Sequence, residues 1–217
     1  MHEARGIIGR VREISDSKAL GPYLEKLDRM RLIRIERSMD AHPRERDRRY
    51  FIADPLIAFW YRFVQTILSS IIEGFGGDVW RHRIAPHLDE YMGRVFEEIC
   101  REHARQHSQD RFPASAQEIG RNWQPDYDID IAGTLLDGSI LYGECKGWNS
   151  LVGENVLDEL MQRASQTAYG RGVDQRQFVL YARKGFTTAL RRRAAAQPEI
   201  VLHTPQTMLR SARLRAC

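Results

Sequence analysis

Apolar residues alternate between helical and strand spacing along the first quarter of the chain. Residues 15–31 predict a helix with one apolar face, and residues 32–36 alternate as in a strand. A polar loop over residues 40–49 has His42 and Pro43 at its tip, and residues 50–52 predict a returning strand. The pattern therefore indicates a helix followed by a two-stranded hairpin with a basic tip.

A helix followed by such a hairpin is typical of the second half of a winged helix. The first half would need about 25–30 further residues in front, roughly the size of its missing helices. Because few residues precede the predicted helix, we expect a winged helix that is truncated at its start. The predicted organisation is a partial winged-helix segment over residues 1–54 and a second domain over residues 55–217.

Two long helices are predicted next, over residues 55–72 and 86–107, with Gly74 to Gly77 ending the first. The apolar run of residues 50–72 is interrupted by polar residues and a proline, namely Asp54, Pro55, Arg62 and Gln65. We therefore expect a buried amphipathic helix here and no membrane partner.

The rest of the chain mixes strands and helices. Strands are predicted near residues 119–123 and over 127–135, 139–146, 177–182 and 200–203. Helices are predicted over residues 155–169 and 187–196, and residues 205–215 form a basic tail or a short helix. This order predicts an α/β (α+β) fold with a mixed sheet flanked by helices.

Charge is distributed unevenly along the chain. Residues 1–50 carry 13 Lys/Arg and 9 Asp/Glu, residues 51–182 carry 12 and 19, and residues 183–217 carry 8 and 1. Basic ends favour a polyanionic partner, whereas an acidic middle is either a solvated surface or a group of carboxylates gathered for a metal. The three cysteines are far apart and odd in number, which is typical of reduced thiols in a cytoplasmic protein.

The chemistry is expected in the hairpin of residues 127–146. A three-residue loop ending at Gly138 would place Asp130 opposite Glu144 and Asp128 opposite Lys146. All four side chains would then share one face, with Ile129, Ile131, Leu135, Leu141 and Cys145 on the other. A two-residue turn at Asp137 and Gly138 would put Asp130 and Glu144 on opposite faces, and the apolar pattern does not choose between the two.

Three acids and a single lysine on one face are costly without a counter-ion, because the like-charged acids repel one another. Mg²⁺ or Mn²⁺ would satisfy these carboxylates, and the lysine would hold the attacking water or the phosphate. A solvated face with an Asp128–Lys146 ion pair explains the spacing equally well.

Several motifs together resemble a known family. They are Tyr50–Pro55 with Phe59–Phe63, Gly93-X-X-Phe96-Glu97, Ile119–Trp123, Asp128–Ile131, Gly143–Lys146 and Gly185–Thr187. Asp130 followed by Glu144-X-Lys146 resembles the PD-(D/E)XK nucleases. The whole set resembles the C-terminal region, of the DUF234 type, of archaeal-type AAA/STAND ATPases. The resemblance implies a restriction-endonuclease-like fold preceded by a winged helix.

The resemblance also implies site residues. Asp130, Glu144 and Cys145 correspond to the metal positions and Lys146 to the catalytic lysine. Glu97 would be the acid on the preceding helix. The helical pattern alone places Glu98 nearer the edge of the apolar face, so Glu98 remains the alternative.

Nucleic-acid contacts are expected from polar residues on the later helices. Gln162 or Gln166 would contact phosphate as in related nucleases, and Arg191, Arg192 and Arg193 would line a DNA backbone. A solvated helix face is an equal alternative for each.

Two departures from the family pattern bear on function. Asp128 stands where the family usually has Glu, and no Gly-X₄-Gly-Lys-Ser/Thr motif occurs, so we expect no ATPase activity from this chain. The predicted function is a Mg²⁺- or Mn²⁺-dependent nuclease that hydrolyses DNA, as the C-terminal part of an ATPase-nuclease protein. The alternative is a non-catalytic DNA-binding or regulatory module that partners a P-loop ATPase.

Overall fold

The computed structural model describes residues 20–41 and 48–214, with side chains described as far as residue 210. The chain divides into two compact units. Of the described residues, the first unit contains 20–37 and 48–91, and the second contains 38–41 and 92–214. The domain boundary expected between residues 54 and 55 stays a prediction.

The first unit begins with helix α2 (Gly21–Arg29) and the strands β1 (Ile33–Glu36) and β2 (Arg49–Ile52). The strands pair antiparallel, with Ile33 opposite Ile52 and Glu36 opposite Arg49. Leu20, Leu24 and Ile33 form the buried centre of this part. The predicted helix and hairpin are thus confirmed over the described residues, while the loop tip at His42 and Pro43 lies outside them. That the hairpin is part of a winged helix stays a prediction.

A helical hairpin completes the first unit. Its first arm begins at α3 (Pro55–Phe59), where the Asp54 side chain accepts hydrogen bonds from two backbone N–H groups of the first turn. The arm continues as π-helical and 3₁₀ turns through α4 (Leu68–Ser70) to a break at Gly74, whose φ is 94°. Glycine adopts this left-handed conformation without the steric cost of a side chain.

The second arm runs through α5 (Gly76–Val79) and a π-helical segment (Trp80–Ile84) into α6 (Ala85–His107). The predicted helix over residues 86–107 is therefore confirmed within a residue of its start, and helical backbone also precedes it from Gly76.

The prediction that the first arm is buried is also wrong for the described residues. An 18-residue window within Pro55–Asp110 has a mean hydropathy of 1.3, enough for a membrane span by length and composition, and only 11% of it is buried. Leu56 and Ile72 are 77% and 76% exposed. The helical spacing of apolar residues predicted the helix correctly but not what covers it.

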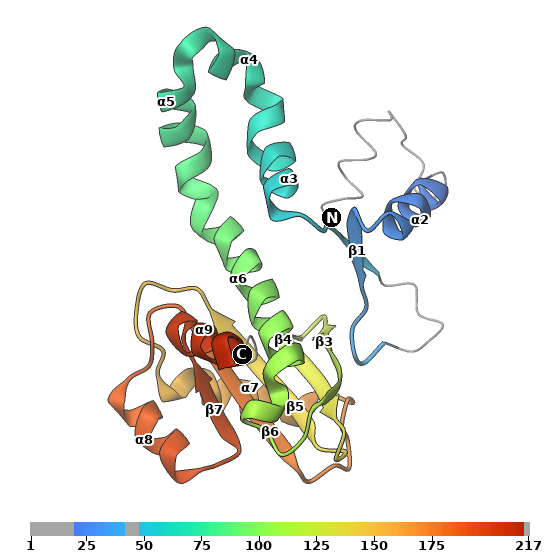
Figure 1. The fold of residues 1–217 in the computed structure, drawn as a ribbon, viewed down its shortest axis with the longest axis vertical. Helices are drawn as coiled ribbons and strands as arrows, with labels where there is room; N and C mark the ends of the chain where they lie inside the picture. Colours follow the sequence, from blue (N-terminus) through green and yellow to red (C-terminus); the bar gives the residue numbers. More distant parts are fainter. Residues whose placement is uncertain (1–19, 42–47, 215–217) are drawn as a thin grey trace. The chain divides into compact units, whose positions relative to one another are not determined.

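The second unit is built on a five-stranded sheet in the order β3 (Ala116–Gln124), β4 (Tyr127–Leu135), β5 (Ile140–Lys146), β6 (Arg176–Ala182), β7 (Ile200–His203). The first three strands form an antiparallel meander, and β6 and β7 run parallel to β5. The parallel connections are the helices α7 (Glu154–Gln166) and α8 (Thr188–Ala196), as parallel strands require. This arrangement confirms the predicted mixed sheet flanked by helices (Figure 1).

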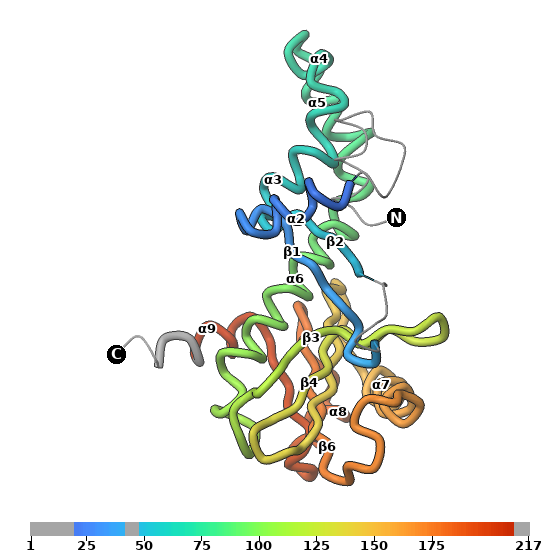
Figure 2. Tube along the Cα trace, turned by 90° about the vertical axis from the view of Figure 1, so that its right-hand side faces the viewer, coloured from blue at the N-terminus to red at the C-terminus, as the bar shows by residue number. Residues whose placement is uncertain are grey.

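Each face of the sheet packs against its own helices. Leu157 and Leu160 of α7 and Leu190 of α8 join the apolar cluster on one face. Cys100 of α6 and Met208 of α9 (Pro205–Leu214) join the cluster on the other. Figure 2 shows the sheet between α6 and α9 on one side and α7 on the other. The C-terminal segment is therefore a helix, one of the two forms expected for it.

A polar cluster fixes the outer edge of the sheet. The backbone of Met39 donates to the Arg121 carbonyl at 2.9 Å, so the segment after β1 lies along β3. The Asp40 carboxylate accepts hydrogen bonds from Asn122 (3.1 Å), Thr167 (2.6 Å) and Tyr127. Burial raises the pKa of Asp40, but the hydrogen bonds from Thr167, Tyr127 and Asn122 outweigh it and lower that pKa below its usual value.

Candidate active site

The hairpin of β4 and β5 has the register predicted from a three-residue loop. Thr134 pairs with Ile140 and Ile131 pairs with Gly143, and Gly138 in the loop has a φ of 84°. A side chain at Gly143 would approach Val179 Cγ1 to 2.6 Å, so β5 and β6 need glycine there. The alternative two-residue turn is excluded.

Next to the Ile131–Gly143 pair, a side chain joins the two strands. The Asp130 carboxylate accepts a hydrogen bond from the backbone N–H of Cys145 at 3.0 Å. Opposite this point β3 and β4 are irregular, because the register shifts between Gly120 and Asn122. At this irregularity the Asp130 side chain points toward β5. Its carboxylate oxygen there accepts the hydrogen bond that a backbone carbonyl would accept in a regular β-sheet.

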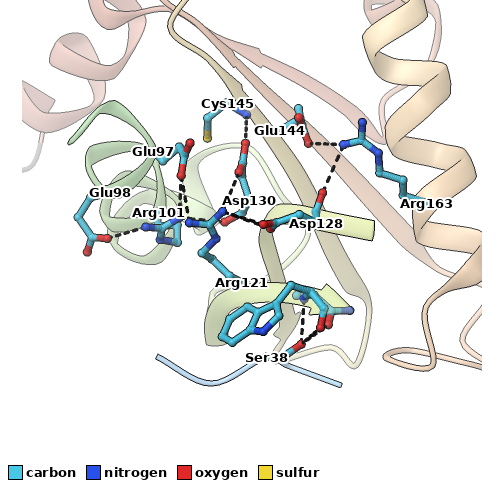
Figure 3. A network of polar contacts seen from close by, with 12 residues as sticks. Ser38, Glu97, Glu98, Arg101, Arg121, Asp128, Asp130, Glu144, Cys145 and Arg163 are labelled. Carbon is cyan, nitrogen blue, oxygen red and sulfur yellow. Dashed lines mark hydrogen bonds and ion pairs between the residues drawn. The ribbon is translucent and has the colours of Figure 1, made fainter. Parts of the chain in front are cut away.

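The irregularity also breaks the predicted alternation along β4. Ile129 packs in the cluster with α7, whereas Ile131 packs in the cluster with α6. The prediction that both lie on one face is therefore wrong, since a bulge moves one residue to the other side of the sheet. The polar side chains meet at the end of the β4–β5 hairpin, between α6 and α7, as Figure 3 shows.

Glu144 is buried and held by two cations. Lys146 Nζ lies 2.6 Å from Glu144 Oε1, and the Arg163 guanidinium of α7 lies 3.3 Å from Glu144 Oε2. Burial raises the pKa of Glu144, and the nearby Asp130 carboxylate raises it further, against the lowering effect of Lys146 and Arg163. The Lys146 ammonium also lies 4.9 Å from the centre of the Trp148 ring. Glu144 and Lys146, two of the predicted site residues, are thus in direct contact, and Asp128, which the sequence placed opposite Lys146, lies beside Arg121.

Arg121 of β3 contacts three carboxylates. Its guanidinium lies 3.2 Å from Glu97 Oε2, 3.2 Å from Asp128 Oδ1 and 3.6 Å from Asp130 Oδ1. These contacts bring α6, β3 and β4 together at one point (Figure 3). Burial raises the pKa of Asp130, and the Arg121 guanidinium works against that rise.

Glu97 and Glu98 on α6 have different surroundings. Glu97 reaches Arg121, and its pKa is raised to about 7, first by burial and then by the Asp130 carboxylate. Glu98 binds Arg101 at 2.7 Å, and Arg101 also donates to the Asp130 carbonyl oxygen at 3.2 Å. Glu97 is therefore the acid that shares a cation with Asp130, which supports Glu97 over Glu98 as the helix acid.

Cys145 contributes its backbone to this centre. Its thiol is buried beside Cys100 in the cluster beneath α6, and burial raises the pKa of the thiol well above its usual value. A thiol kept protonated in this way is a poor metal ligand, so any role in metal binding falls to the main chain of Cys145.

The predicted nucleic-acid residues lie apart from these contacts. Gln162 is exposed on α7, and Arg191 and Arg192 are exposed on α8. Arg193 binds Asp158 of α7 at 2.7 Å. Among the contacts of the described residues, none joins these four side chains to the carboxylates.

Three arginines of the site carried no functional prediction from sequence. Arg101 follows Glu97 and Glu98 at helical ion-pair spacing, which is a usable signal. Arg121 lies within the Ile119–Trp123 motif, but no local pattern indicates its partners. Arg163 adjoins the predicted Gln162 yet faces Glu144 instead.

A second buried polar cluster lies between α6 and the strands β6 and β7. His103 Nδ1 lies 2.9 Å from the Tyr181 hydroxyl, and its ring packs against His107 and His203 at 4.9 Å and 4.7 Å. Burial lowers the pKa of His103 to about 4 and that of His203 to about 3. Across residues 20–41 and 48–214, no group of three or more His, Cys, Asp or Glu side chains is arranged to hold a metal ion.

The fold and centre define a class: a mixed α/β domain with carboxylates and a lysine at the end of its central hairpin. The DUF234 family, described as archaea bacterial proteins of unknown function, matches residues 60–160. This match confirms the resemblance to the DUF234 type for that segment.

The chain is also similar to the uncharacterized protein MJECL04 of Methanocaldococcus jannaschii, with 31% identity over 139 residues. The match covers 63% of this chain and 31% of that protein, so the chain spans about a third of its relative's length.

Two solved structures show partial similarity to the fold. A repair endonuclease from Pyrococcus abyssi has 12% identity and a TM-score of 0.30, covering 41% of this chain and 38% of the endonuclease. EndoMS in complex with double-stranded DNA has 12% identity and a TM-score of 0.33, covering 50% of this chain and 43% of EndoMS.

Proposed function

We propose that the second unit is a metal-dependent nuclease that hydrolyses DNA phosphodiester bonds. The observation that carries the proposal is the junction of β4 and β5. There Asp130 bonds to the backbone of Cys145, and Glu144 bonds to Lys146. Two carboxylates at one strand junction can hold a divalent metal, and an ammonium group beside them can stabilise charge on a phosphate.

The residue types suit Mg²⁺ or Mn²⁺, although the described side chains are not arranged as a metal site and these carboxylates pair with cationic side chains. Asp130, Glu144 and Glu97 offer carboxylate oxygens, the ligands that these hard cations prefer, and the Asp130 carboxylate lies close enough to raise the pKa of both Glu144 and Glu97. When bound, the metal would supply an activated water and would neutralise charge on the phosphate.

The chain's own residues would do the rest. Lys146 is held between Glu144 and the Trp148 ring, so its ammonium group is positioned to hold the attacking water or a phosphate oxygen. The water attacks phosphorus, and the bond from phosphorus to the leaving sugar oxygen breaks. A proton then passes to that oxygen.

The proposal that DNA is the substrate rests on the basic charge of the C-terminal part of the chain. Residues 183–217 carry 8 Lys/Arg and 1 Asp/Glu, and Arg191 and Arg192 are exposed on α8. Such a surface favours a phosphate backbone. In the same proposal, a P-loop ATPase is the partner and the cytoplasm is the location.

Plasmid cleavage tests the proposal. Wild-type protein, Asp130→Ala and Arg105→Gln would be incubated with supercoiled plasmid and Mg²⁺ or Mn²⁺, with EDTA as a parallel arm. Arg105 is a matched control because it pairs with Glu102 on α6, outside the carboxylate centre. Cleavage by wild type and Arg105→Gln, and none with Asp130→Ala or EDTA, is expected. Equal cleavage by all three proteins would contradict the proposal.

One observation favours a second candidate, a non-catalytic DNA-binding or regulatory module. The carboxylates are already paired with Arg121, Arg163 and Lys146, so the fold compensates their charge without a metal. A gel shift with duplex DNA, in a protein that cleaves with neither Mg²⁺ nor Mn²⁺, would support this candidate over the nuclease.

A further inference from the structure

We propose that the Arg121 guanidinium is an internal cation that divalent metal and substrate phosphate displace together. This inference rests on the proposed nuclease function and concerns the regulation of the same centre. Arg121 lies between Glu97 of α6 and Asp128 and Asp130 of β4, with nitrogen–oxygen distances of 3.2, 3.2 and 3.6 Å. It therefore occupies the position where a metal shared by Glu97 and Asp130 would lie.

The charge of the centre is partly compensated by its own side chains. The carboxylates of Glu97, Asp128, Asp130 and Glu144 contact the cations of Arg101, Arg121, Lys146 and Arg163, and Glu98 and Glu159 share two of these cations. A divalent cation placed between Glu97 and Asp130 would meet the Arg121 guanidinium at short range. Binding at that position is therefore favourable only if Arg121 moves away.

Arg121 is the cation best placed to move. Arg101 is also tied to Glu98 and to the Asp130 carbonyl, so its departure would break contacts outside the candidate metal position. Lys146 and Arg163 hold Glu144 and do not contact Glu97 or Asp128 side chains through any bond described for this part of the chain. Arg121, by contrast, makes its side-chain contacts to the very oxygens that a metal would need.

The backbone of Arg121 is held by contacts that do not involve its side chain. The Arg121 carbonyl accepts from Met39 at 2.9 Å, and Ser38 bridges to Arg121 along the edge of β3. A rotation of the side chain would leave these bonds intact. The planar guanidinium fork matches two oxygens of a phosphate, so a substrate phosphate near the centre would compensate its loss of carboxylates.

Linkage follows from this arrangement. If the metal and Arg121 compete for the same carboxylates, a phosphate that binds Arg121 raises metal affinity, and metal raises phosphate affinity equally. The free protein should then bind metal weakly and load it together with DNA.

Mn²⁺ binding followed by electron paramagnetic resonance tests this inference without reference to cleavage. Wild type, Arg121→Gln and the control Arg105→Gln would be titrated with Mn²⁺, alone and with a phosphorothioate DNA duplex that resists hydrolysis. We expect Arg121→Gln to bind Mn²⁺ at least about fivefold more tightly than wild type without DNA, a factor within the usual range of coupling between sites. The duplex should raise Mn²⁺ affinity in wild type and Arg105→Gln but much less in Arg121→Gln.

The outcomes separate the two proposals. Equal or weaker Mn²⁺ binding by a folded Arg121→Gln protein, with wild-type binding intact, would overturn the displacement of Arg121 and leave the nuclease proposal standing. A failure of wild type and both variants to bind Mn²⁺, with or without duplex, would overturn the proposed metal-dependent function itself.

A measurement on the wild-type protein covers the case in which Arg121→Gln does not fold. The arginine Nε–Hε resonances would be followed by nuclear magnetic resonance during a Mg²⁺ titration in the presence of the duplex, with Arg121→Lys to assign the Arg121 signal. A shift of the Arg121 resonance larger than that of Arg101 is expected. An Arg121 resonance that stays fixed at Mg²⁺ saturation would overturn the inference.

Discussion

The Asp130 carboxylate accepts a hydrogen bond from the backbone N–H of Cys145 at 3.0 Å, and so joins β4 to β5 through a side chain. The charge and the hydrogen-bonding capacity of Asp130 therefore have separate roles. The hydrogen bond to Cys145 joins β4 to β5 at the end of the hairpin away from its loop. The negative charge is what the proposed metal would bind.

Two substitutions of Asp130 separate these roles. Asp130→Asn keeps an oxygen for the Cys145 N–H, so its free energy of unfolding should stay within about 1 kcal/mol of wild type. Asp130→Ala leaves that buried N–H unpaired and should cost about 1–3 kcal/mol. Urea unfolding measures both values. Metal-dependent cleavage should fall at least about 100-fold in each, because each loses the ligand charge; an active Asp130→Asn protein would contradict the ligand role.

Replacing Arg101 should lower the stability of the protein more than replacing Arg105, one turn further along α6. It is 4% exposed and binds Glu98 and the Asp130 carbonyl. Arg101→Ala leaves the half-buried Glu98 carboxylate and the Asp130 carbonyl oxygen without this donor, which should lower the free energy of unfolding by about 1–3 kcal/mol. Arg105→Ala, whose ion pair is half exposed, should cost less than about 1 kcal/mol. Similar urea midpoints for the two variants would show that Arg101 is not a structural cation.

The histidine cluster predicts a loss of stability in mild acid. In the unfolded chain a histidine takes up a proton near its ordinary pKa of about 6.5, whereas in the folded protein His203 stays neutral down to about pH 3. The unfolded state thus binds more protons between these values, and the contribution of His203 to stability falls as the pH falls through that window.

His203→Phe keeps an aromatic ring against Tyr181 and removes the titrating group. Between pH 7 and 4.5 it should lose about 1–3 kcal/mol less stability than wild type. The comparison of variant with wild type is needed because burial raises the pKa of Glu97 to about 7, which acts in the opposite direction. Parallel stability curves for the two proteins would contradict the buried neutral state of His203.

The exposed helical hairpin should tolerate polar substitutions. Ile72 is 76% exposed, so Ile72→Ser should change the free energy of unfolding by less than about 0.5 kcal/mol. Leu160 is fully buried beneath the sheet, so Leu160→Ala should lower the free energy of unfolding by about 2–5 kcal/mol. Chemical unfolding of the isolated protein measures both; a large loss in Ile72→Ser would show that another surface covers this arm.

Local patterns predicted the elements of the second unit well. Alternation and length placed β4, β5, β6 and β7 within a residue of their ends, and the observed hairpin register is one of the two that the sequence offered. These features depend on neighbours in sequence, so the sequence carries them directly.

Features that depend on distant neighbours were not predictable in the same way. The bulge that sends Ile129 and Ile131 to opposite faces arises from pairing with β3, and no local pattern marks it. The contacts of Arg121 and Arg163 depend on where α6, α7 and β3 meet. Exposure of the first helical arm likewise depends on what covers it, which a helical period does not specify.

The most direct test of the nuclease proposal is the Mg²⁺-dependent cleavage of a labelled DNA duplex by wild type and by Lys146→Met. Lys146→Met removes the ammonium group that contacts Glu144 while keeping a long apolar side chain. We predict a wild-type rate that EDTA abolishes and a loss of about 100-fold or more in Lys146→Met, a typical effect of removing a group that stabilises developing charge. Cleavage at the same rate by Lys146→Met and wild type would contradict the assignment of this centre as the nuclease site.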